Sequence, residues 1–243
     1  LANMMMKYSV FAGCSSSSDY ANAWQDPSLN NNLMLTTTYS LMDRRCFGYR
    51  YSLAGPNAQK VLMFHSNSVL YPHFIGNPLA IISGMLFSNS SHDYGFFSCK
   101  VGERFQYIDK LAGTGYAHTI QRTFTANELL LERAEAKVML GRYDDAFRDM
   151  QLYWSISIHS MDPSDYKSFA DNNYCLELTK ANLLRYWGDP ANANCFDNWN
   201  FTQNISSSYV VPADAVPYMN FINDFRRFET NFEGLRFFDL KRW

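Results

Sequence analysis

Two acidic residues near the C-terminus, Glu229 and Glu233, have the residue type and spacing closest to enzyme chemistry. Glycoside hydrolysis requires a pair of carboxyl groups, one of them protonated as the general acid. Arg226 lies three residues before Glu229, and Arg236 lies three residues after Glu233. Because a neighbouring guanidinium favours the ionised carboxylate, neither acid is expected to supply a proton. The spacing therefore predicts ion pairs rather than catalysis.

Other patterns of catalytic or metal-binding residues are absent from the sequence. The five histidines lack a metal-binding spacing such as H-E-x-x-H, and no G-x-S-x-G nucleophile motif occurs. The five cysteines are scattered without a C-x-x-C pair, which favours buried thiols over zinc and leaves one disulfide open. The segment Gly113-Thr114-Gly115 lacks the third glycine, the preceding strand and the helix start of a nucleotide loop. We predict no enzymatic activity, no catalytic residue, no cofactor and no metal site.

Aromatic residues offer a different chemistry, the binding of neutral sugars. Sugar rings stack their C–H surfaces on flat aromatic faces, and planar polar groups bind their hydroxyls. Tyr49, Arg50 and Tyr51 cluster just before a Gly-Pro turn and, with Trp24, are our predicted carbohydrate-binding residues. Further aromatic and polar candidates are Tyr39, Asn57, Asn67, Tyr71 and Trp199. For each residue taken alone, core packing or chance exposure is the simpler interpretation.

The composition agrees with a neutral ligand. Aromatic residues make up 16% of the 243 residues, and charged residues make up 18%, below the usual value of about 25%. The net charge of −2 gives no electrostatic reason to expect a nucleic-acid partner. The sequence contains no run of 18 or more apolar residues, the length that would predict a membrane-spanning helix. A hydrophobic content of 47% predicts a folded chain with a sizeable core.

The last 26 residues, Tyr218–Trp243, show the three-and-four spacing of one helix face. The apolar positions are Tyr218, Phe221, Ile222, Phe225, Phe228, Phe232 and Leu235. One interpretation is an amphipathic helix with a solvated charged face. The other is a helix enclosed by other elements, with its charges paired inside. Gly234 and the aromatic residues Phe237, Phe238 and Trp243 among the charges favour the second interpretation.

Within this segment, the string FRRFETNFEGLRFFDLKRW resembles the C-terminal signature of the SusD/RagB-like family of glycan-binding lipoproteins on the outer surface of Bacteroidetes. The matching positions are Arg226, Arg227, Glu229, Glu233, Gly234, Arg236, Phe237, Phe238, Asp239, Leu240, Arg242 and Trp243. In that family the signature belongs to the helical scaffold and does not mark the ligand site. Family members are usually longer, so the resemblance implies a fragment that is incomplete at both ends.

The resemblance implies an all-α fold of tetratricopeptide-like helical hairpins with long irregular loops. We expect one domain over residues 1–243, with a helix end at 1–12, a loop-rich ligand-side region at 13–125 and a helical-repeat scaffold at 126–243. The implied function is non-catalytic capture of an oligosaccharide and its delivery to a TonB-dependent, SusC-like transporter. The implied location is the outer membrane, reached only through a lipid anchor outside this chain. A repeat scaffold that binds protein segments without glycan, or a glycoside hydrolase, are the alternatives.

The clearest local prediction is a helical hairpin over Thr125–Ser157. Thr125 and Glu128 form a capping-box pattern, and Gly141 ends the first helix. Asp144 and Asp145 fall in the first turn of the second helix, where the helix dipole favours acids. The spacing matches half of a tetratricopeptide repeat and also resembles the equivalent hairpin of SusD-like proteins.

The flanking segments give weaker predictions. Asn172–Trp187 is predicted as one helix, and Pro212 begins a further helix. The residues of the first helix that are predicted to face inward are Leu176, Leu183, Leu184 and Trp187. Leu33–Met42 is either a helix or an extended segment. Residues 11–15, around Cys14, resemble a lipoprotein cleavage box, but the residues before them lack an apolar core of 7–15 residues. We therefore expect residues 1–12 to be the end of a helix.

Overall fold

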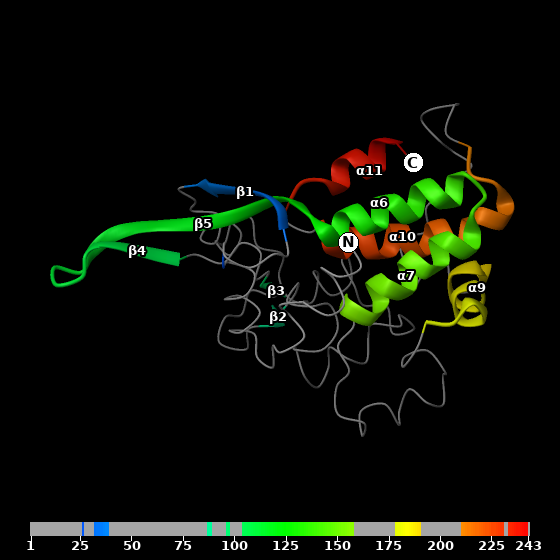
Figure 1. Ribbon diagram of the computed structural model, residues 1–243, viewed down its shortest axis with the longest axis horizontal. Helices are drawn as coiled ribbons and strands as arrows, with labels where there is room; N and C mark the ends of the chain where they lie inside the picture. The colour runs from blue at the N-terminus through cyan, green and yellow to red at the C-terminus, as the bar shows by residue number, and fades with distance from the viewer. Residues whose placement is uncertain are drawn as a thin grey trace, which may run out of the picture.

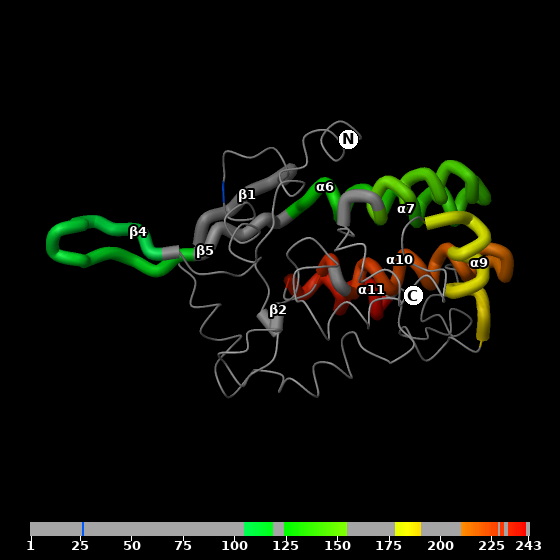
Figure 2. Tube along the Cα trace, turned by 90° about the horizontal axis from the view of Figure 1, so that it is seen from below, coloured from blue at the N-terminus to red at the C-terminus, as the bar shows by residue number. Residues whose placement is uncertain are grey.

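In the computed structural model, the described part of the chain is Asp26 and residues 32–38, 87–88, 96–97, 104–157, 178–190, 210–230 and 233–242. Most of these residues form helices that pack into one body (Figure 1). A long β-ribbon projects from one end of that body, away from the helices in both views (Figures 1 and 2). The mostly helical content agrees with the predicted class, whereas the ribbon was not predicted. The helix end expected at residues 1–12 lies outside the described part.

The ribbon is an antiparallel sheet of β1 (Asn32–Thr38), β5 (Thr114–Thr125) and β4 (Arg104–Asp109), with β5 in the centre. Thr38 pairs with Thr119 on one side of β5, and Arg104 pairs with His118 on the other. A second pair joins β2 (Phe87–Ser88) to β3 (Phe96–Phe97). The prediction of an irregular region over 13–125 is therefore wrong for these segments, and the extended alternative holds for residues 33–38. β5 is rich in threonine and aromatic residues, which favour strands.

A tight turn joins β4 to β5. The carboxylate oxygen Oδ1 of Asp109 accepts hydrogen bonds from the backbone nitrogens of Leu111, at 2.8 Å, and Ala112, at 3.1 Å. Gly113 follows with φ of 65°, a left-handed conformation that suits glycine. The segment Gly113-Thr114-Gly115 thus ends a hairpin turn. The expectation that no strand precedes it is wrong, but a strand rather than a helix follows, so the segment is not a phosphate loop.

The predicted helical hairpin is confirmed. α6 (Ala126–Met139) begins directly after β5, and Thr125 Oγ1 accepts a hydrogen bond from Glu128 N at 3.2 Å. Gly141, with φ of 71°, follows α6 and allows the chain to reverse into α7 (Tyr143–Ser157). Small residues at the interface, Ala134 and Ala146, are fully buried, which lets the two helices approach closely.

The next described helix is shorter than predicted. α9 (Lys180–Gly188) begins at Thr179, whose hydroxyl accepts a hydrogen bond from Asn182 N at 3.1 Å. Thr179 has an extended backbone, so the single helix predicted over Asn172–Trp187 is wrong at this residue, and residues 172–177 lie outside the described part. Leu183 and Trp187 are buried as predicted, whereas Leu184 is exposed, contrary to prediction.

The C-terminal segment forms two helices instead of the predicted one. A short 3₁₀ turn, η4 (Ala213–Ala215), follows Pro212 and leads into α10 (Val216–Glu229). α11 (Arg236–Arg242) forms the second helix. Between them Gly234 adopts φ of 76°, which breaks the helical path, and Arg226 of α10 reaches Asp239 of α11 with a 2.9 Å hydrogen bond. A three-and-four apolar spacing does not detect such a break, because two successive helices can keep the same phase.

α10 is the central helix of the body. It packs against α6, α7 and α9, and α9 lies at the end opposite the ribbon (Figures 1 and 2). Phe221 and Phe225 of α10 meet the rings of Trp154 and Trp187, with centroid distances of 4.8 to 6.3 Å. All four rings are at most 5% exposed, so one aromatic core joins α7, α9 and α10.

Candidate functional site

Three charged residues of the signature, Arg226, Glu229 and Asp239, lie in the interior of the helical body. Arg226 Nε donates to Asp239 Oδ2 at 2.9 Å, and these side chains are only 5% and 1% exposed. Arg226 Nη1 also lies 3.6 Å from Glu132 Oε1 of α6. The pair Arg226–Asp239 therefore connects α10 to α11, and Glu132 extends the connection to α6. For α10, this arrangement confirms the enclosed helix with internally paired charges. For α11 the same interpretation is wrong at Phe237 and Phe238, which are 57% and 63% exposed.

A second buried carboxylate joins α10 to α9. Asp224 Oδ2 accepts a hydrogen bond from Trp187 Nε1 at 3.2 Å, and Asp224 Oδ1 accepts one from Arg227 Nη2 at 2.7 Å. Asn220 Nδ2 donates to the carbonyl oxygen of Trp187 at 2.8 Å. The two contacts with Trp187 fix the end of α9 against α10, and the Arg227 contact holds the Asp224 side chain within α10. The acids of α10 thus orient its neighbours.

Glu229, the first of the two acids considered for catalysis, lies in the same interior. It is 1% exposed, and its Oε2 accepts hydrogen bonds from the Tyr153 hydroxyl at 2.8 Å and from Asn127 Nδ2 at 3.4 Å. These donors come from α7 and α6, so Glu229 ties three helices together. Its carboxylate faces protein donors rather than an open cleft.

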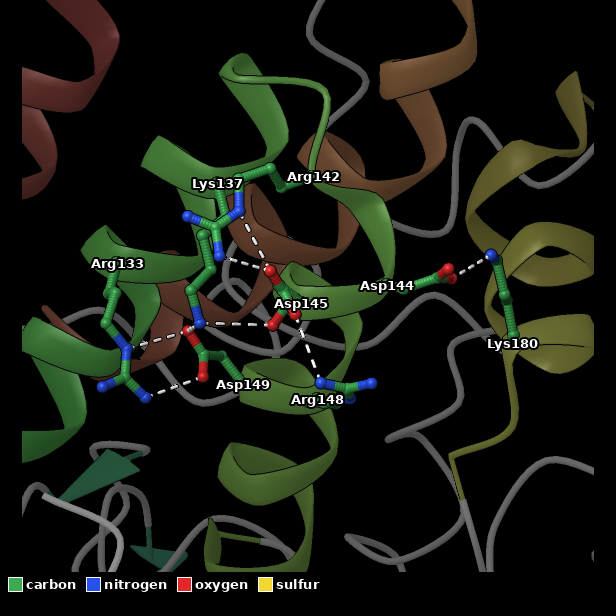
Figure 3. Close-up of polar contacts among 8 residues, drawn as sticks. All are labelled: Arg133, Lys137, Arg142, Asp144, Asp145, Arg148, Asp149 and Lys180. Carbon is green, nitrogen blue, oxygen red and sulfur yellow. Dashed lines mark hydrogen bonds and ion pairs between the residues drawn. The ribbon is translucent and has the colours of Figure 1, made fainter.

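The outer face of α6 and α7 carries a row of ion pairs (Figure 3). Asp149 accepts two hydrogen bonds from Arg133, at 2.9 and 2.7 Å, and one from Lys137 at 2.6 Å. Asp145 lies between Arg142 and Arg148, and the Arg142 hydrogen bond lowers the pKa of Asp145.

Asp144 of α7 reaches Lys180 of α9 in the same row (Figure 3). The hydrogen bond from Lys180 to Asp144 raises the pKa of Lys180. Every basic side chain drawn in this row is therefore held by an acid. In the part of the chain that the structure describes, no group of three or more His, Cys, Asp or Glu residues could hold a metal ion.

Exposed aromatic residues lie on the β4–β5 hairpin and, as Phe237 and Phe238, on α11. Phe105 and Tyr107 are 47% and 53% exposed, and their rings meet edge to face at a centroid distance of 4.9 Å. A Cβ built on Gly115 would lie 2.8 Å from the Phe105 ring and 2.1 Å from the Gln106 carbonyl oxygen. The glycine therefore lets the ring of Phe105 lie close over the neighbouring strand. We call Phe105 and Tyr107 the ring pair.

The ring pair is the best candidate binding surface among the described residues. It combines two exposed aromatic rings, which present C–H-binding faces and one hydroxyl, on a strand paired with β5, which limits their freedom. The predicted contacts Trp24, Tyr49, Arg50 and Tyr51 lie outside the described residues. The other candidates outside the described part are Tyr39, Asn57, Asn67, Tyr71 and Trp199.

Sequence reasoning missed the ring pair although a signal was present. The alternation Phe-Gln-Tyr in β4, followed by a glycine-containing turn and a threonine-rich run, is typical of a hairpin with aromatic residues on one face. None of the described helices is long and apolar enough to cross a membrane. No family model, no curated protein and no solved structure matches this chain.

Proposed function

We propose that this chain is part of a non-catalytic, SusD-like protein that binds oligosaccharide at the bacterial cell surface. In this proposal the bound glycan is delivered to a TonB-dependent transporter, and a lipid anchor outside the chain holds the protein at the outer membrane. The observation that carries the proposal is the enclosed set of signature charges. Arg226, Glu229 and Asp239 are buried and engaged by other helices, as a scaffold segment requires.

The finer description of the fold belongs to the same proposal. The α6–α7 hairpin, with its fully buried Ala134 and Ala146, is proposed to be one tetratricopeptide-like unit. α10 supplies the apolar surface that covers this hairpin, because a single unit cannot bury its own face.

The ring pair is the proposed glycan contact within the described residues, and Trp24, Tyr49, Arg50 and Tyr51 remain proposed contacts outside them. Two exposed rings without a charged partner between them suit a neutral sugar, whose affinity comes from stacking and hydroxyl hydrogen bonds. Such binding should depend little on salt, because no ion pair is formed.

Calorimetry across a panel of neutral and acidic oligosaccharides tests this function. We expect a neutral glycan to bind equally at low and high salt, and Phe105→Ala to weaken binding by about tenfold through the lost stacking. Phe238→Ala is the matched control, since Phe238 is 63% exposed on α11, far along the chain from the ring pair. Its binding should equal that of the unmodified chain.

Three outcomes would contradict the proposal. Binding that disappears at high salt would indicate an anionic ligand instead. Release of reducing sugar from a bound polysaccharide would indicate a glycoside hydrolase. Binding of peptides with no response to any glycan would favour the protein-interaction scaffold.

A further inference from the structure

We propose that the ring pair selects a 6-deoxyhexose, such as a fucose or rhamnose unit, over the matching hexose that carries a hydroxyl at C6. The inference rests on the proposed function and names the class of sugar that this surface takes. Phe105 and Tyr107 meet at an interplanar angle of 74°, with their ring centroids 4.9 Å apart. Two rings at this angle form a corner, in which one ring is the floor and the other is the wall.

The opposite strand, β5, fixes the shape of this corner. Phe105 pairs with Ala117, and Tyr107 pairs with Gly115, so both cross-strand neighbours are small. A Cβ on Gly115 would lie 2.8 Å from the Phe105 ring, so this ring lies over the glycine that is paired with Tyr107. That position brings the two rings into contact. They remain 47% and 53% exposed, so about half of each ring is open to a ligand.

The corner offers little hydrogen bonding. Side chains alternate between the two faces of a strand, so Gln106 and its cross-strand partner Tyr116 lie on the face opposite the ring pair. The Asp109 carboxylate serves the turn, where its Oδ1 accepts from two backbone nitrogens. The corner itself therefore presents C–H and ring surface and one polar group, the Tyr107 hydroxyl.

A 6-deoxyhexose matches this chemistry. A pyranose stacked on the floor ring directs its C5 substituent sideways, where the wall ring stands. In a 6-deoxyhexose this substituent is a methyl group, whose C–H bonds suit an aromatic surface. In an ordinary hexose it is a hydroxymethyl group, whose hydroxyl would lose water beside the wall without gaining a partner. An N-acetyl group suits the corner less well, because its amide N–H and its carbonyl both need partners.

Matched pairs of methyl glycosides test the inference with the full chain. Methyl α-L-fucoside and methyl α-L-galactoside differ only at C6, as do methyl α-L-rhamnoside and methyl α-L-mannoside. Titrations followed by ligand-observed nuclear magnetic resonance give the dissociation constant of each sugar. We expect the 6-deoxy member of at least one pair to bind about five- to tenfold more tightly, because a partly open corner penalises an unpaired hydroxyl only moderately.

Three variants show whether the ring pair is the origin of this preference. Phe105→Ala removes one side of the corner and should bring the ratio of the two dissociation constants close to one. Tyr107→Phe keeps both rings and should keep the ratio. Phe238→Ala is the matched control, since it removes an exposed ring from α11 and should leave the ratio unchanged. A ratio measured on one protein sample does not depend on how much of that sample is folded.

Three results would overturn the inference. These are equal dissociation constants within both pairs, tighter binding of the hydroxymethyl sugar in both pairs, or a preference that survives in Phe105→Ala. If a neutral oligosaccharide binds in the calorimetric panel while both pairs show no preference, the sugar class is wrong and the proposed function is retained. If no oligosaccharide binds at all, the proposed function fails together with the inference.

Discussion

At the scale of single residues, the buried charges of α10 decide how its neighbours are oriented. Removing two ions from water costs several kcal/mol for each ion, and only a well-formed pair recovers that cost. Arg226 and Asp239 meet this condition with a 2.9 Å hydrogen bond in a nearly inaccessible position. Because of this desolvation cost, removing either Arg226 or Asp239 should strongly destabilise the fold.

Asp239→Ala is therefore expected to lower the free energy of unfolding by about 3–5 kcal/mol, because Arg226 would remain buried without its main counter-ion. Urea denaturation monitored by circular dichroism measures the change. Asp144→Asn is the control, since it removes an exposed pair with Lys180 and should barely move the midpoint. If the urea midpoint fell by a similar amount in both variants, burial would not determine how much these ion pairs stabilise the fold.

At the scale of elements, backbone conformation decides where the C-terminal segment divides. A right-handed helix cannot continue through a residue with φ of 76°, and for residues with a Cβ this conformation costs about 1–2 kcal/mol. Gly234 therefore has a definite role between α10 and α11. It permits the reversal that brings Asp239 back to Arg226.

Gly234→Ala should destabilise the fold by about 1–2 kcal/mol through backbone strain alone, since a Cβ there would meet no atom within 4 Å. Gly234→Asn should cost less, because asparagine tolerates the left-handed conformation better. Thermal unfolding of the two variants tests this order. A more stable alanine variant would mean that the segment prefers one continuous helix.

At the scale of the whole molecule, surface ion pairs should shape the response of stability to pH. Arg142 lowers the pKa of Asp145, so the folded state holds this carboxylate ionised to lower pH than the unfolded state does. The resulting stabilisation is present above the unfolded pKa and disappears as the pH falls through the folded one. Lys180 behaves oppositely, since its raised pKa gives stabilisation that is lost only at alkaline pH.

Arg142→Ala should therefore lower the urea midpoint near neutral pH and should cease to matter in strong acid. The reason is that protonated Asp145 no longer attracts the guanidinium. Urea titrations of the variant and the unmodified chain from neutral pH down to about pH 2 measure the difference. A difference that stays constant with pH would show that Arg142 acts through packing instead of charge.

Local signals in the sequence determined the α6–α7 hairpin. The Thr125 cap, the chain reversal at Gly141 and the apolar spacing all act within a few residues, so they can be read without knowing where the rest of the chain goes. The same short range explains why the turn at Gly113 could have been predicted together with the alternation of Phe105 and Tyr107. These residues specify a hairpin by themselves.

Only the tertiary structure decided which side chains meet when their residues lie far apart in the sequence. Sequence spacing favoured Glu229 as the partner of Arg226, yet Arg226 is paired with Asp239 and Glu132, and Glu229 accepts from Tyr153. The pairing of β1 with β5 and the burial of the α10 charges likewise depend on distant segments returning to one place. Periodicity records which face a side chain occupies, but the partner on that face is set by the packing of whole elements.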